Sequence, residues 1–380
     1  MKKTIAGVSS RHAVVSNDDL LIEIMLRLPV LPLQRFKAVC KRWLTLITNP
    51  NLNLRRTQTS ILDPPSGIFL TKNRSYKYDF VAFDVTIPPN RSPLRTSYTL
   101  NFDRREVHIL QSCNGLLFCR MFRPTTSDEF YVLNPFTNRF KLIPQCPCPI
   151  KSIRFRMAFD PSKSPHYKVV YAARRVGNVH HTSTIQLHIY SSETCKWSEC
   201  AARFNAKSFE NFYDGLYWND GLHWLEGKRP GDLNYKLDVE DLHLRSRRIP
   251  RTSDAGDYYQ KLFVSRGCLL LLGTENTYSL QMNIYEMRKW SLGWSLKYFV
   301  NLNDISRQFP KPSWDPKWSC SSVGCIVIKE NENDSFIVVE INGNIVQYKM
   351  VSKMISKLYD FNSSDPDVRF LEFIASLACV

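Results

Sequence analysis

A repeated strand pattern constrains the fold of this chain most strongly. A glycine followed by a short apolar run recurs at Gly115, Gly221, Gly267 and Gly324, at intervals of 106, 46 and 57 residues. The longest interval holds a further unit without the glycine, with apolar runs that begin at Tyr167 and Ile185. We expect each glycine to occupy a turn that leads into the next strand. A period of about 50 residues, with about four strands per unit, is typical of β-propeller blades.

Most of these runs are followed by a second strand pair around a polar turn. The segments 131–144, 235–250 and 336–350 have this pattern, and Asn342-Gly343 is a strong hairpin signal. Such radial repetition leaves only short, protected sheet edges. We therefore predict an all-β, propeller-like domain of six or seven kelch-like blades over residues 57–380, preceded by a small all-α segment at residues 16–56 and a disordered tail at residues 1–15.

The segment from Ser16 to Ile47 has helical spacing instead of strand spacing. Ser16 and Asp19 have the spacing of a capping box, which predicts a helix start. Pro29 is expected to end this helix, and Pro32 to lie in the first turn of a second helix that continues to Ile47. So short a segment cannot bury its own apolar residues, because units below about 40 residues usually need a partner. It docks either on the rest of the chain or on another protein.

The order of residues in this segment resembles the F-box, the module by which a receptor docks on the Skp adaptor of cullin-based ubiquitin ligases. The usual Leu-Pro opening is absent, with Ser16 and Asn17 in its place, and Leu31-Pro32 replaces the more usual Lys-Ser. The resemblance implies that the adaptor, and through it cullin and a RING protein, are partners. The adaptor-binding positions that it implies here are Leu20, Leu21, Ile24, Leu28, Pro29, Leu33, Phe36, Val39, Cys40, Trp43 and Ile47.

Beyond Cys113, segments such as 112–119, 131–144 and 157–170 resemble the F-box-associated interaction domain of plant F-box proteins. This resemblance implies a domain that binds a protein substrate for ubiquitination, although it does not identify the target. It also implies a receptor subunit that is not itself an enzyme and needs no cofactor.

Composition indicates which environments and partners suit the chain. The formal charge of +16 favours acidic binding partners. An acidic adaptor protein would be one such partner, and nucleic acid is the alternative. The 11 cysteines are an odd number scattered along the chain, which favours reduced thiols in the cytoplasm or nucleus. The longest apolar run, Cys268–Leu272, is far too short to span a membrane, so we expect no membrane partner.

A histidine cluster could bind a metal and an acidic cluster could act in acid–base catalysis, but a structural role explains each cluster better. His180, His181 and His188 lack a thiol or carboxylate at ligand spacing, so we expect no metal site there. Asp238, with the neighbouring pair of acidic residues Glu240 and Asp241, fits a solvated turn better than an acid–base pair.

Two other clusters are candidates for substrate binding. Arg245, Arg247 and Arg248 form the densest positive cluster, which indicates a charged blade edge or, alternatively, a site for an acidic degron. Trp314 and Trp318 lie in an irregular loop and are either interface anchors or buried against a blade.

Two other classes of function stay open from the sequence alone. A propeller enzyme of the kelch-like oxidase or hydrolase type would need polar groups that converge on one propeller face, and a tightly bound metal would favour it. A basic nucleic-acid-binding module would show steeply salt-dependent binding to unrelated oligonucleotides. We regard nucleic acid as the less favoured partner, because aromatic residues are not interleaved with the arginine cluster.

Overall fold

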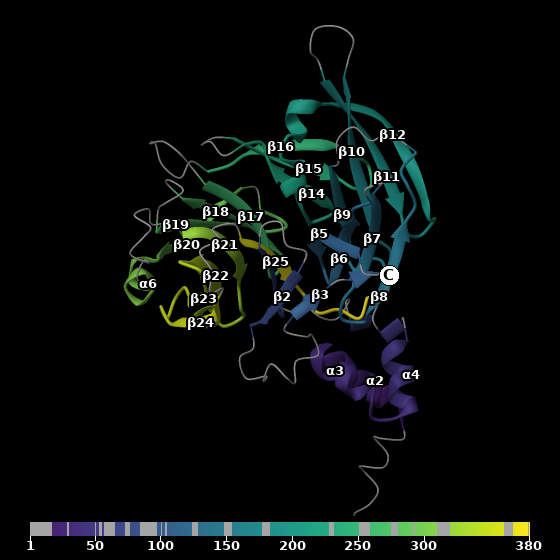
Figure 1. The fold of residues 1–380 in the computed structure, drawn as a ribbon, viewed down its shortest axis with the longest axis horizontal. Coiled ribbons are helices and arrows are strands. Elements are labelled where there is room, and N and C mark those ends of the chain that lie inside the picture. Colours follow the sequence, from purple (N-terminus) through teal and green to yellow (C-terminus); the bar gives the residue numbers. More distant parts are fainter. Residues whose placement is uncertain are drawn as a thin grey trace, which may run out of the picture.

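The structure is a computed structural model, and it places helices at one end of the chain and sheets in the rest. It describes residues 17–28, 30–49, 51–52, 55–56, 65–72, 77–83, 97–99, 101–102, 105–123, 128–147, 154–176, 183–227, 232–250, 259–274, 280–291, 293–309, 320–360, 368–378 and 380. Within these residues, six antiparallel sheets surround a common centre, and the helices lie at the rim (Figure 1).

Each sheet is one blade, and its strands follow one another in the chain, except in the first. Blade A joins β25 (Val368–Phe373) to β1 (Gly67–Lys72), β2 (Lys77–Ala82) and β3 (Ser97–Thr99). Blade B runs from β4 (Asn101–Phe102) through β5 (Arg105–Cys113), β6 (Leu116–Met121) and β7 (Glu129–Asn134) to β8 (Arg139–Ile143). Blade C contains β9 (Phe155–Ala158), β10 (Lys168–Val176), β11 (Ser183–Ser191) and β12 (Lys196–Asn205).

The other three blades have the same order. Blade D contains β13 (Leu216–Trp218), β14 (Gly221–Leu225), β15 (Leu233–Asp238) and β16 (Leu244–Arg248). Blade E contains β17 (Tyr259–Ser265), β18 (Cys268–Thr274), β19 (Gln281–Met287) and β20 (Ser295–Asn301). Blade F contains β21 (Cys320–Val327), β22 (Phe336–Ile341), β23 (Asn344–Lys349) and β24 (Ile355–Asp360).

The prediction of a propeller is confirmed, with six blades, but two of the four glycines do not lie in turns. Gly115 and Gly267 have positive φ between their strands, and Asn342-Gly343 forms the expected hairpin. Gly221 instead begins β14, because Asn219 and Asp220 take the positive φ values of that turn. Gly324 lies inside β21 at a bulge, where a side chain would collide with Phe370.

The core consists of apolar layers between neighbouring blades. Successive residues of β1 show how they form, because side chains alternate between the two faces of a strand. Ile68 and Leu70 pack against blade F, whereas Phe69 between them packs against Phe80 and Phe373 in the layer that includes blade B. Each such side chain contributes roughly 1.5–3 kcal/mol when it is fully buried.

Strands from both ends of the chain close the ring. β25 pairs with β1 in register from Gly67↔Phe373 to Lys72↔Val368. The segment after β25 then reaches blade B, where the Asn134 side-chain amide donates to the carbonyl oxygens of Ser376 (3.0 Å) and Ala378 (2.8 Å). Asn134 is fully buried, so the C-terminal segment satisfies an amide that would otherwise be costly to bury.

The innermost strands surround a channel that contains ionisable groups. Lys261 on β17 donates from Nζ to the carbonyl oxygen of Val323 (3.0 Å), and burial lowers the pKa of its ammonium group. Burial also raises the pKa of Glu372 on β25 to about 8, although the positive charge of Lys261 opposes that shift. The channel therefore holds a carboxyl group that is largely protonated at neutral pH.

Gly115→Ala should destabilise the ring closure more than Gly267→Ala. Both substitutions strain a residue with positive φ, at about 1–2 kcal/mol. At Gly115 the new methyl group would also collide with Ser376, whereas nothing lies within 4 Å of the position at Gly267, so we expect a further loss of about 1–3 kcal/mol. Urea unfolding of both variants measures the difference, and equal losses would contradict this account of the closure.

Glu372→Gln should remove a pH dependence of stability. Between the ordinary glutamate pKa and the folded-state pKa of about 8, the folded protein binds one more proton at Glu372 than the unfolded chain does. Wild-type stability should therefore fall as pH rises through this window, by up to about 1.4 kcal/mol per pH unit, relative to the variant. Unfolding free energies at pH 5 and pH 8 test this, with Asp241→Asn at an exposed turn as control. Parallel curves for wild type and Glu372→Gln would contradict it.

Candidate functional site

Among the residues described before Asn49, the N-terminal module contains three helices, so the prediction of two is wrong. They are α2 (Asp18–Arg27), α3 (Val30–Phe36) and α4 (Lys41–Thr48). The expected second helix is interrupted by a turn at 37–39 and by Cys40, which is extended with φ −163° and ψ 166°. Valine and cysteine are weak helix formers, and this break brings the rings of Phe36 and Trp43 edge to face at 5.2 Å.

Both ends of α2 are capped by side chains. Asn17 is its N-cap, because the side-chain oxygen accepts hydrogen bonds from the backbone N–H of Asp19 (2.9 Å) and Leu20 (3.4 Å). The predicted cap Ser16 lies outside the described residues. At the other end, the buried guanidinium of Arg56 donates to the carbonyl oxygens of Met25 and Leu28, which lack partners within the helix.

The predicted adaptor-binding residues divide into an inner and an outer set. Leu21, Leu33 and Ile47 are buried, and they belong to a core that is continuous with blades A and B. Leu28, Phe36 and Trp43 are half-buried at its margin. Cys40 is exposed. Pro29 lies outside the described residues. The remaining predicted positions, Leu20, Ile24 and Val39, are exposed, together with Leu44, which was not predicted.

Helix geometry explains why α2 has two apolar faces. Leu21 and Met25 are one turn apart and face the core, whereas Leu20 and Ile24 are one turn apart on an adjacent face. Leu20 is 44% exposed and Ile24 is 43% exposed. We name the exposed side chains Leu20, Ile24, Val39 and Leu44 the outer apolar set. Four exposed large apolar side chains on a module this small indicate an interaction surface.

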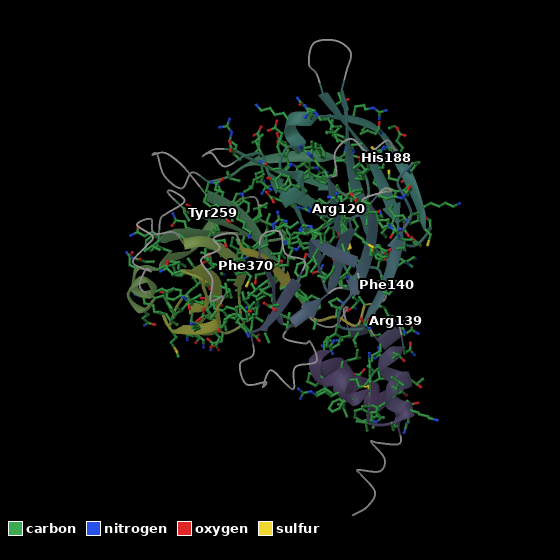
Figure 2. The ribbon with its side chains drawn as sticks, viewed as in Figure 1. Arg120, Arg139, Phe140, His188, Tyr259 and Phe370 are labelled. Atoms are coloured by element: carbon green, nitrogen blue, oxygen red, sulfur yellow. The ribbon has the colours of Figure 1, made fainter. Side chains whose placement is uncertain are left out.

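Two partly exposed ion pairs link segments of the module. Asp18 at the start of α2 pairs with Arg42 of α4 at 2.6 Å, and Glu23 pairs with Arg55 at 2.7 Å. The module also packs on blade B, because its buried residues share one core with Leu117 and Leu133. Burial and the positive charge of Arg139 lower the pKa of Lys37. Figure 2 shows Arg139 on β8 beside the helices. The N-terminal helical module therefore packs directly against the propeller.

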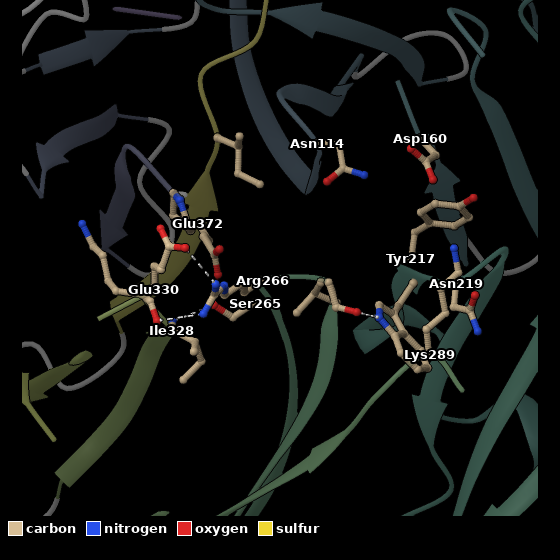
Figure 3. Close-up of a pocket in the computed structure, with 16 residues that line it drawn as sticks. Asn114, Asp160, Tyr217, Asn219, Ser265, Arg266, Lys289, Ile328, Glu330 and Glu372 are labelled. Atoms are coloured by element: carbon tan, nitrogen blue, oxygen red, sulfur yellow. Dashed lines mark hydrogen bonds and ion pairs between the residues drawn. The ribbon is translucent and has the colours of Figure 1, made fainter. Parts of the chain in front are cut away.

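A cavity of 420 Å³ lies at one end of the ring of inner strands (Figure 3). It is lined by the ends of the inner strands and by the turns that follow them. Arg266 and Glu330 lie on one wall, 3.9 Å apart, and Tyr217 and Asn219 lie on the opposite wall. The lining includes side chains of both charges, together with the indole of Trp218, whose N–H donates to the carbonyl oxygen of Gly267 (2.9 Å).

The arginine cluster lies on an exposed blade edge, as predicted. Arg245, Arg247 and Arg248 are on β16, the outermost strand of blade D, and all three are exposed. Arg247 donates to the carbonyl oxygen of Ser291 (3.5 Å) beside Trp290, which is 90% exposed. The sequence alone does not predict that Ser291 and Trp290 lie near Arg247, because these two residues belong to blade E. Trp314 and Trp318 lie outside the described residues, so their role stays a prediction.

The other residues that were considered as candidates from the sequence have positions that fit a structural role. Asp238 accepts hydrogen bonds from the backbone N–H of Glu240 (3.0 Å) and Asp241 (3.5 Å), which confirms the solvated turn. His188 is buried on β11, and His180 and His181 lie outside the described residues. Among the residues that the structure describes, no group of three or more His, Cys, Asp and Glu side chains could hold a metal ion. None of the described helices is both long and apolar enough to cross a membrane.

Sequence reasoning missed the ionisable residues of the channel. Arg156, Lys261 and Glu372 lie on three inner strands that are far apart in the sequence. Arg156 is the one charged residue of β9 and Lys261 that of β17, whereas Glu372 shares β25 with Arg369. One or two charges in a short strand are a weak signal in the sequence. Only the closed ring brings the three strands to one centre.

Comparison with known proteins matches both parts of the chain. The F-box domain matches residues 17–55, and the F-box associated beta propeller domain matches residues 67–378. The F-box protein At5g07610 of Arabidopsis thaliana is 30% identical over 398 residues, which cover 98% of this chain and 94% of that protein. The F-box protein At5g49610 of the same plant is 28% identical over 296 residues, which cover 72% and 77%.

Solved structures offer a weaker likeness. A chain of the nidogen/laminin complex has a TM-score of 0.43 and 4% sequence identity, and the match covers 82% of this chain and 99% of that one. The sequence matches, which extend over both the helical module and the propeller, are the informative ones. The chain therefore belongs to the plant F-box proteins that carry an F-box-associated β-propeller domain.

Proposed function

We propose that this chain is the substrate-recognition subunit of a Skp–cullin–F-box ubiquitin ligase. The observation that carries the proposal is the outer apolar set, which lies on the module that matches the F-box domain. The buried residues of the module stabilise its attachment to the propeller, and the outer apolar set is left for the Skp adaptor. The adaptor in turn connects the chain to cullin and a RING protein.

The proposed mechanism is proximity. The propeller binds a protein target and holds it near a ubiquitin-charged enzyme that is bound elsewhere in the complex. A tethered target then meets the reactive thioester at high effective concentration, so no residue of this chain has to form a covalent bond. The proposed role is therefore that of a non-catalytic receptor, which is typical of this family.

The same proposal places the chain in the cytoplasm, the nucleus or both. Among the described residues, the cysteines are free thiols, and several of them, including Cys113, Cys119 and Cys325, are buried. Reduced thiols are the usual state in these compartments. The basic character of the chain also suits an acidic adaptor.

The double substitution Leu20→Asp and Ile24→Asp should reduce co-purification of the Skp adaptor at least tenfold. Both side chains are exposed, so two added carboxylates would be forced into an apolar interface without disturbing the core. These positions give a cleaner test than Leu28 or Trp43, which are half-buried and also support the fold. The measurement is capture of the adaptor by full-length chain, with thermal unfolding as a check on folding.

Val351→Asp is the matched control, because Val351 is also exposed, at 44%, but lies on blade F. We expect this variant to capture the adaptor as wild type does. Wild-type capture by the double variant, with its fold intact, would refute the proposed docking surface.

A further inference from the structure

A second cavity, of 380 Å³, lies toward the starts of the inner strands, away from the cavity of Figure 3. Its volume is in the range of small-molecule sites. Phe370 of β25, labelled in Figure 2, contributes an apolar wall together with Phe155 and Leu371. The hydroxyl groups of Thr71 and Ser322 also line it. The charged or titratable lining residues are His108, Arg156, Tyr213, Asp214, Lys261 and Arg369.

Arg156 is the least expected group in this lining. Only 7% of its surface is exposed, and burial lowers the pKa of its guanidinium to about 10, although the charge of Asp214 opposes that shift. Its Nη1 donates to the carbonyl oxygen of the adjacent residue Phe155 (3.1 Å), and its Nε has no hydrogen-bond partner. No described residue forms an ion pair with it. An unpaired buried charge costs several kcal/mol, so the site favours an anion.

A second arginine reaches the same cavity from β25. Arg369 donates from Nη1 to Nε2 of His108 (3.2 Å), which makes that ring nitrogen an acceptor. Burial and the positive charges of Arg369 and Arg120 lower the pKa of His108. His108 is therefore neutral at pH 7, and it orients a guanidinium at the edge of the cavity without adding a charge.

The charges that line the cavity do not balance. Arg156, Lys261 and Arg369 are three cations from three blades, and Asp214, at the end of the short helix η3 (Phe212–Asp214), is the carboxylate among the lining residues that the structure describes. Glu372 lies farther along the channel and is largely protonated, as its raised pKa indicates. The lining thus carries a net charge of about +2, which a phosphate monoester dianion would neutralise.

We propose that this cavity binds an organic phosphate monoester, with Arg156 and Arg369 as its hydrogen-bond donors and Lys261 as a further positive charge. Guanidinium groups bind phosphate through paired, charge-assisted hydrogen bonds. The apolar wall of Phe155, Phe370 and Leu371 accommodates the organic part of the ester. A phosphorylated side chain of a target and a small-molecule phosphate ester share this chemistry. The inference does not depend on the role in ubiquitin transfer, because it concerns binding alone.

The test is calorimetric titration of the full-length chain at constant ionic strength. Phenyl phosphate is the probe, and benzoate is the matched ligand that lacks the phosphate. We expect phenyl phosphate to bind and benzoate to bind at least tenfold more weakly. Affinity for phenyl phosphate should also rise between pH 5.5 and 7.5, as the monoester loses its second proton near pH 6. Absence of phenyl phosphate binding at millimolar concentration, or equal binding of benzoate, would overturn the proposal.

Substitutions of the lining arginines test whether phenyl phosphate binds in this cavity. Arg369→Gln and Arg156→Gln should each weaken phenyl phosphate binding by about 10-fold or more, because each removes charge-assisted hydrogen bonds. Arg245→Gln on the edge of blade D is the matched control, with unchanged affinity expected. Arg369 is exposed, so its variant tests the site even where Arg156→Gln proves unstable. Wild-type affinity in a folded Arg369→Gln variant would overturn the assignment.

A second titration identifies the source of the ester. N-acetyl-phosphoserine amide represents a phosphorylated side chain, glucose 6-phosphate represents a free metabolite, and inorganic phosphate represents the bare ion. Tighter binding of either ester supports the proposal and identifies its source. Equal affinity for inorganic phosphate and all esters would overturn the role of the apolar wall.

Discussion

The pairing of β1 with β25 is the interaction on which the rest of this structure depends. The first and last strands of the propeller share one sheet, and this pairing closes the six blades into a ring. The pairing is non-covalent, and it is supported by packing of Phe69 against Phe373 and by the hydrogen bonds from Asn134 to the C-terminal segment. Without this closure, β1 of blade A would present an unpaired edge, and the channel would lose the wall that β25 forms.

Local patterns in the sequence predicted the repeated architecture well. The strand runs, the Asn342-Gly343 hairpin and the acidic turn at Asp238 depend on neighbouring residues, so a single sequence contains the necessary information. The helix break at Cys40 was missed because neither glycine nor proline marks it, and the weak helix formers Val39 and Cys40 are a fainter signal. Gly324 was misplaced because its role, making room for Phe370, depends on a residue 46 positions away in the chain.

The candidate sites were predictable only where a motif contains them. The F-box resemblance identified the module, but periodicity alone could not divide its apolar residues into the inner and outer sets. That division depends on blades A and B, which bury Leu21 and Met25 and leave Leu20 and Ile24 exposed. The channel residues could not be grouped at all, because their proximity results from ring closure and not from spacing along the chain.

The layer between blades A and B has a consequence for synthesis of the chain. It contains Leu21 and Met25 from α2, and also Phe373, Ala375 and Leu377 from β25 and the segment after it, which are translated much later. The N-terminal helices therefore leave the ribosome long before the surface that completes their core exists. A ribosome that stops short of β25 releases a chain whose F-box lacks part of its support, so one C-terminal truncation impairs both ends of the receptor.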